Sequence, residues 1–202
     1  TRGLVLVFFM ITSVNVFAQA VPEAGDPPNN INIPDFYKSK LSDIESVLNT
    51  VKTGKVETIS TSPGGLPVFA VYYGEKDDFH SQANYNSAVA ARNPVFHAKK
   101  GPGTKPVIFF LGPVHGHEIE GIVGLLNLIS ITETGKDKRG KEWPGLKSNF
   151  DKCRVIIIPC GNPDGRKRNP YDSFVGLPID VMTKYGQGTR KDGTLWRWPH
   201  VK

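Results

Sequence analysis

Two apolar segments with a helical pattern between them limit most strongly what this chain can fold into. "KPVIFFLG" (105–112) and "CRVIIIPC" (153–160) are continuously apolar and rich in β-branched residues, as expected of strands buried in a sheet. The segment after Glu118 places apolar residues on a broad helical face. A strand, a helix and a second strand at this spacing predict a βαβ crossover and therefore a sheet that is at least partly parallel. We expect 105–112 to be a central strand covered on both faces.

The preceding residues predict a helix and a hairpin. Residues 35–54 carry apolar residues at helical offsets and end at Gly54. "KVETIST" and "LPVFAVYYG" are strand-like and are joined by "SPGG", a turn signal. Residues 75–105 are polar and irregular, with a short helix expected around "YNSAVAAR". The predicted fold class is α/β: a three-layer α/β/α sandwich with a mixed, partly parallel sheet.

The N-terminus predicts export. Arg2 precedes a short apolar run, and "AQA" at 18–20 supplies the small residues of a cleavage site. We expect residues 1–20 to be a signal peptide cleaved after Ala20, with a membrane anchor as the lesser alternative. Residues 21–34 are an extended lead-in, and 35–202 form the folded domain. The predicted location is secreted or periplasmic, without stable membrane association after cleavage.

The charge distribution argues against a nucleic-acid-binding protein, and the cysteine spacing argues against a disulfide-stabilised one. The net charge is +6, but the basic residues cluster only in Gly-rich, loop-like stretches (135–141 and 165–170), which we interpret as solvated loops. No nucleic-acid-binding motif accompanies them, so no nucleic-acid partner is expected. Cys153 and Cys160 would lie more than about 20 Å apart on an extended strand, too far for a disulfide with each other.

The residues after the first apolar strand, "HGHEIE" (115–120), allow three interpretations. His115 and Glu118 form an H-x-x-E pair whose side chains can turn into one crevice and bind zinc. His115 and His117 form an H-x-H pair that would share one face if the strand continued through Gly116. In a purely structural interpretation, the acids favour a helix N-terminus and the histidines line a turn. We assign Glu120 to this structural role, and we interpret Gly116, Gly121 and Gly124 as close-packing positions, with Gly116 letting the backbone pass near an ion.

A second motif favours the first interpretation. "VIIIPCGNPDG" (155–165) resembles the P-x-x-N-P-D-G stretch of zinc carboxypeptidases, the carboxypeptidase A-like family. "GPVHGHEIEG" (112–121) resembles the same family's stretch around H-x-x-E, and the order and spacing of the two motifs also match. The resemblance covers roughly residues 40–200 and corresponds to the N-terminal half of a family catalytic domain.

The resemblance implies a metal centre with one Zn²⁺. His115 and Glu118 correspond to two of the family's three zinc ligands, while His117 occupies a variable position and is not counted as a ligand. The family's third ligand, a His, and its general base, a Glu, come from later strands. His200 lies in a different setting and is not favoured as the third ligand. We therefore expect the domain to be truncated on its C-terminal side, with the missing groups beyond Lys202.

The resemblance also suggests a residue for carbonyl polarisation. Family enzymes carry an Arg in an L-W-R context after N-P-D-G, and "TLWRW" offers Arg197, with Arg166 and Arg168 as runners-up. The implied function is zinc-dependent hydrolysis of a C-terminal peptide bond by metal-activated water, acting on a peptide or cell-wall peptide. The alternatives are a zinc-dependent deacylase of N-acyl amino acids, similar to aspartoacylase, and an inactive peptide-binding domain of the same fold.

Overall fold

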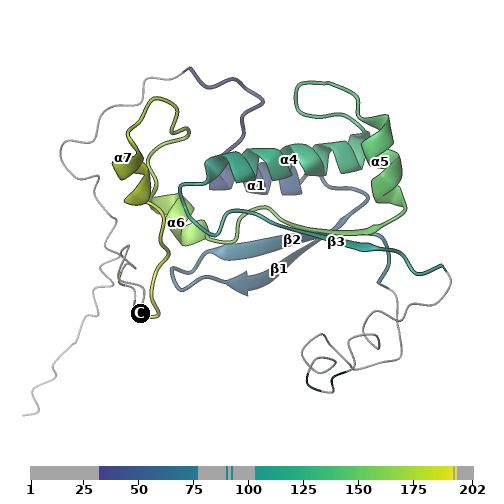
Figure 1. Cartoon of the computed structure of the whole chain (residues 1–202), viewed down its shortest axis with the longest axis horizontal. Helices are drawn as coiled ribbons and strands as arrows, with labels where there is room; N and C mark the ends of the chain where they lie inside the picture. The colour runs from purple at the N-terminus through teal and green to yellow at the C-terminus, as the bar shows by residue number, and fades with distance from the viewer. Residues whose placement is uncertain (1–31, 77–89, 91, 93–102, 193, 195–202) are drawn as a thin grey trace, which may run out of the picture.

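The sheet is mixed, as the sequence predicts. In a computed structural model that describes residues 32–76, 90, 92, 103–192 and 194, its four strands follow the order β1-β2-β4-β3 (Figure 1). They are β1 (Lys55–Thr61), β2 (Pro67–Tyr73), β3 (Val107–Leu111) and β4 (Arg154–Ile158). The β1–β2 hairpin and the β2–β4 pair are antiparallel, whereas β3 and β4 are parallel. The predicted hairpin and the predicted parallel crossover are both confirmed.

The crossover helix α4 (Ile119–Thr134) carries much of the core. It begins where predicted, directly after Glu118, and ends at Gly135, whose φ of 78° is a left-handed conformation that favours glycine. Together with α1 (Leu41–Leu48) and α5 (Pro144–Asp151) it lies over one face of the sheet (Figure 1). The buried cluster beneath these helices includes Ile44, Val71, Leu126, Phe150, Val155 and Ile157. The order of the elements from β3 through α4 to β4 therefore brings the ends of both strands to one edge of the sheet.

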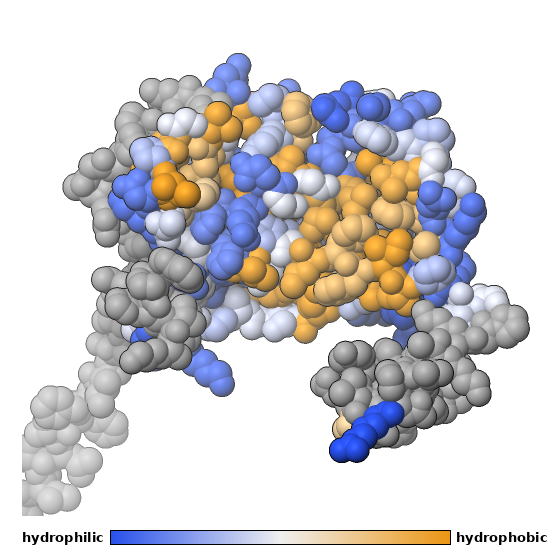
Figure 2. Space-filling view, viewed as in Figure 1, coloured by the Kyte–Doolittle hydropathy of each residue, from blue (hydrophilic) through white to orange (hydrophobic). Residues whose placement is uncertain are grey.

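The prediction that 105–112 is a central strand covered on both faces is wrong for the described part of the chain. β3 is the last strand in the sheet order, and Val107, Phe109 and Leu111 are 51–56% exposed. Only the alternate residues Ile108 and Phe110 pack against the core. Figure 2 shows apolar side chains gathered over the region where β3 and α4 lie in Figure 1. A helical layer on this second face, as in the predicted three-layer sandwich, is not found among the described residues.

The structure also contains the shorter helices α1, α6 (Pro163–Arg168) and α7 (Ile179–Thr183). The predicted helix within 35–54 is reduced to α1, because the Asp43 carboxylate accepts the N–H groups of Ser39 and Lys40 and fixes its start. α6 and α7 were not predicted.

Cys153 and Cys160 are both free, as expected. The predicted signal peptide and the helix around "YNSAVAAR" lie outside the described residues, apart from Ala90 and Arg92 of the latter.

Within the described ranges, none of the helices combines the length and the apolar character needed to cross a membrane.

Candidate metal centre

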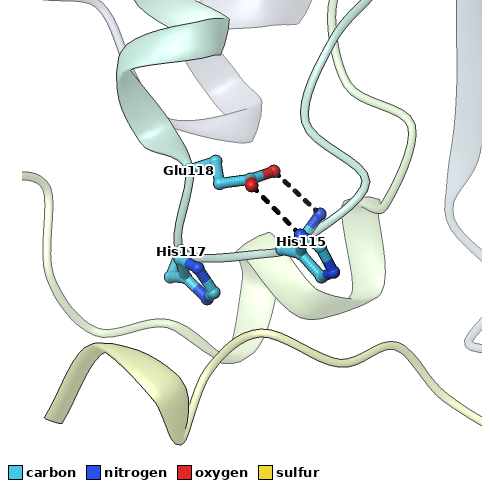
Figure 3. A group of neighbouring side chains, drawn as sticks. All are labelled: His115, His117 and Glu118. Atoms are coloured by element: carbon cyan, nitrogen blue, oxygen red, sulfur yellow. Dashed lines mark hydrogen bonds and ion pairs between the residues drawn. The ribbon is translucent and has the colours of Figure 1, made fainter. Parts of the chain in front are cut away.

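The histidines and acids lie on the connection between β3 and α4. β3 ends at Leu111, and Glu118 is the N-cap of α4. The strand therefore does not continue through Gly116, which contradicts the condition for the H-x-H interpretation. The connection is short, so His115 and Glu118 leave neighbouring elements and turn toward the same point (Figure 3).

His115 and Glu118 are in direct contact. His115 Nδ1 lies 3.0 Å from Glu118 Oε1, and the His115 backbone N–H donates to Glu118 Oε2 at 3.3 Å (Figure 3). Both side chains are close to half exposed, at 42% and 47%. An imidazole nitrogen and a carboxylate oxygen thus meet at a point that solvent and small ions can reach.

His117 belongs to the same cluster, although it was not predicted to be a ligand. Ligand atoms of His115, His117 and Glu118 all lie within 4.8 Å of one another. The two imidazole rings are almost parallel, at 6°, with centroids 5.6 Å apart. His117 Nδ1 is buried without a hydrogen-bond partner and would contact a Cβ built on Gly186. The signal that could have revealed this proximity is the H-x-H spacing, here produced by a turn instead of a strand.

The protonation states suit a cation. Burial raises the pKa of Glu118, but the hydrogen bonds from the His115 side chain and backbone outweigh it, so that the net pKa lies below its usual value. Burial lowers the pKa of His117, with the Glu118 charge opposing this shift. Glu118 is therefore ionised and His117 neutral at neutral pH, which are the forms that bind a metal.

The donor set fits zinc. Imidazole nitrogen and carboxylate oxygen are typical zinc ligands, and in a tetrahedral site ligand atoms lie about 3.4 Å apart. His115 Nδ1 and Glu118 Oε1 are 3.0 Å apart, and the ligand atoms of His115, His117 and Glu118 all lie within 4.8 Å of one another. These distances lie on either side of the tetrahedral value. His115, His117 and Glu118 therefore form a group that could hold a metal ion.

The second motif lies against the first, as the predicted crossover requires. β4 ends at Ile158, and its following loop runs beside the loop after β3. Gly112 N–H donates to Ile158 O at 2.6 Å, and Gly161 and Asn162 N–H both donate to Pro113 O. The two strand-end motifs therefore form one continuous structure at the carboxyl edge of the parallel pair.

Gly116 is a close-packing position, as the sequence predicts. It packs against the backbone of Gly165 in the second motif, while the passage of its backbone near an ion stays a prediction. A Cβ at position 116 would lie 2.1 Å from the Gly165 carbonyl carbon. The glycine is needed because two backbones meet there.

Asp164 of the second motif connects the site to the β1–β2 hairpin. Its carboxylate is 5% exposed and accepts hydrogen bonds from Ser62 Oγ at 2.6 Å and Gly64 N at 3.0 Å. The hairpin turn is thereby fixed beside α6.

We expect Asp164→Ala to lower the free energy of unfolding by about 2 kcal/mol, because the Ser62 hydroxyl and the Gly64 N–H lose a charged acceptor. Urea denaturation measures this change. Asp35→Ala, at an exposed aspartate, is the matched control and should stay within about 0.5 kcal/mol of wild type. Equal stabilities of the two variants would contradict the role of Asp164.

The arginines of α6 are neither solvated nor free to reach a substrate. The Arg166 side chain is 5% exposed and donates to Ser39 O, Asn169 O and Asp172 Oδ1 at 2.7–2.9 Å. Arg168 donates to Thr189 Oγ1 and Gln187 O. The interpretation of 165–170 as a solvated loop is therefore wrong for these two residues, and burial with three hydrogen bonds gives Arg166 a structural role.

The remaining predicted site residues have mixed outcomes. Arg197 and His200 lie outside the described residues. Glu120 accepts a hydrogen bond from Tyr37 Oη at 2.9 Å, which ties the segment before α1 to α4 and agrees with its assigned structural role. Together with burial, this bond raises the pKa of Tyr37 to about 12.

The chain was compared with protein families, curated proteins and solved structures. No protein-family model and no curated protein matches the chain. Among solved structures, it is similar to a metallo-carboxypeptidase from Burkholderia cenocepacia, with 14% identity, a TM-score of 0.45 and coverage of 64% of this chain and 28% of that one. It is also similar to carboxypeptidase A from Helicoverpa armigera, with 13% identity, a TM-score of 0.46 and coverage of 80% and 32%. The chain spans about a third or less of the length of these proteins.

Proposed function

We propose that this protein is an exported metallocarboxypeptidase. It would be a zinc-dependent hydrolase that cleaves the C-terminal peptide bond of its substrate. The observation that carries the proposal is the 3.0 Å contact between His115 Nδ1 and Glu118 Oε1 at the end of a parallel strand. The resemblance of both strand-end motifs to zinc carboxypeptidases supports the same assignment. The substrate would be a peptide or a cell-wall peptide.

Each of the proposed site residues would have a distinct role. His115 and Glu118 hold the ion, with a neutral imidazole and an ionised carboxylate. When bound, zinc supplies a water activated for attack near neutral pH and polarises the substrate carbonyl. Arg197 is proposed to donate hydrogen bonds to the oxyanion that develops on that carbonyl, a contribution that typically lowers a barrier by about 3–4 kcal/mol.

The substrate class is tested with a panel of chromogenic peptides beside N-acyl amino acids, using the full-length protein. We expect release of C-terminal residues from the peptides, loss of this activity with a zinc chelator and recovery when zinc is returned. Preference for N-acyl amino acids would replace the peptidase by a deacylase. Zinc binding without turnover of either class would instead indicate a peptide-binding domain.

A further inference from the structure

We infer that Asn162 and Asn169 are positioning residues that fix the loop carrying His115. The inference rests on the proposed metal centre, because its functional consequence is the affinity of that centre for zinc. The observations that carry it are hydrogen bonds from both amide side chains to backbone carbonyls next to His115.

The carbonyl groups of the loop are satisfied in succession. Pro113 O accepts from the backbone of the second motif, as described above, and His115 O accepts from Glu118 N at 3.2 Å. Two carbonyls remain, one before and one after His115. Asn162 Nδ2 donates to Val114 O at 3.0 Å, and Asn169 Nδ2 donates to Gly116 O at 3.2 Å. The backbone that presents His115 is therefore held on both sides by an amide from the second motif region.

The amides are themselves held in a fixed orientation. Asn162 Oδ1 accepts from Gly165 N at 2.8 Å, and Asn169 Oδ1 accepts from Tyr171 N at 2.9 Å. Since each oxygen already faces an N–H group, each Nδ2 must face the loop carbonyl. Asn162 also approaches Gly186 O at 3.4 Å, and Gly186 O accepts from Gly116 N at 2.9 Å. Asn169 is only 4% exposed, so water does not readily replace its contact.

These contacts explain how a half-exposed pair can stay oriented. His115 and Glu118 have little side-chain packing of their own, at 42% and 47% exposure. Beyond their contact with each other and the stacking of His115 on His117, their position depends on the backbone, which the two asparagines hold. Supporting groups of this kind commonly change metal affinity about 10–100-fold when removed.

The test replaces each of the two donors by an acceptor of the same shape. Asn162→Asp and Asn169→Asp each keep an acceptor oxygen for Gly165 N or Tyr171 N but lose the Nδ2 donor. Asp also serves as well as Asn at the N-cap of α6, so Asn162→Asp preserves that role. The added negative charge would by itself favour a cation. Weaker binding would therefore come from displacement of the loop, because the hydrogen bond is lost and a carboxylate oxygen faces the loop carbonyl in its place.

Asn127→Asp is the matched control. Asn127 Nδ2 donates to Val123 O at 2.9 Å, and its Oδ1 accepts from Lys138 N at 2.9 Å. The variant thus removes the same kind of bond and adds the same charge, but it does so along α4, away from the loop. It measures the effect of such a change on stability alone.

Zinc affinity is measured by competition with a chromophoric chelator, Co²⁺ absorption reports the coordination geometry, and thermal unfolding of the metal-free proteins reports stability. We expect about 10–100-fold weaker zinc binding and an altered Co²⁺ spectrum in Asn162→Asp and Asn169→Asp, with Asn127→Asp within about 3-fold of wild type. If either Asn162→Asp or Asn169→Asp fails to fold, the zinc affinity of the other variant tests the inference. Wild-type affinity in the folded variants, or an equal loss in Asn127→Asp, would overturn the inference. Wild-type protein that binds no zinc would instead refute the metal centre itself.

Discussion

Protein carrying both His115→Ala and Glu118→Ala is expected to retain less than about a tenth of the zinc bound by wild type, because the two groups are the proposed ligands that the site supplies from neighbouring elements. The contact between His115 Nδ1 and Glu118 Oε1 already brings the donors to one point. Elemental analysis after exhaustive dialysis measures the metal content directly.

Two single variants make this measurement specific. Glu120→Gln removes the nearby acid that binds Tyr37 and should leave the zinc content unchanged. His117→Ala measures separately what the third donor of the cluster contributes. Equal zinc in wild type and in the His115/Glu118 double variant would rule these ligands out.

Gly116→Ala is expected to lower the free energy of unfolding by roughly 3 kcal/mol or more, at the upper end of overpacking effects. The added methyl would lie 2.1 Å from the Gly165 carbonyl carbon and 2.4 Å from its oxygen, so one of the two backbones must move. Because Gly116 lies between His115 and His117, we also expect weaker zinc binding in whatever fraction remains folded. Chemical denaturation and zinc titration of the same samples measure both effects.

Gly124→Ala provides a control of opposite sign. Gly124 lies within α4, and a Cβ there meets nothing within 4 Å, so the predicted close-packing role is wrong for this glycine. Replacing an unhindered helical glycine by alanine should raise stability by about 0.5–1 kcal/mol. If Gly116→Ala were as well tolerated as Gly124→Ala, the close packing of the two motifs would be wrong.

The backbone arrangement of the site could be predicted because it depends on local patterns. The apolar runs at 107–111 and 154–158 and the helical pattern after Glu118 are strong signals, and the parallel crossover follows from their order. Once both strands are parallel neighbours, their carboxyl ends must share one edge. The meeting of the two motifs was therefore predictable from sequence.

The side-chain contacts were not predictable in the same way. Burial of Arg166 depends on Asp172 and on the carbonyl of Ser39, more than a hundred residues earlier in the chain. The exposure of one face of β3 was missed because a continuously apolar run does not reveal which face is covered. The proximity of His117 arises from a turn whose geometry the spacing of the histidines does not specify.

The most direct test of the metal centre is an anomalous difference map from crystals of the protein soaked with zinc, recorded on both sides of the zinc absorption edge. We predict one strong peak within about 2.0–2.2 Å of a His115 imidazole nitrogen and a Glu118 carboxylate oxygen. A map with no peak between these two side chains, or with the ion bound elsewhere on the chain, would contradict the proposed metal centre.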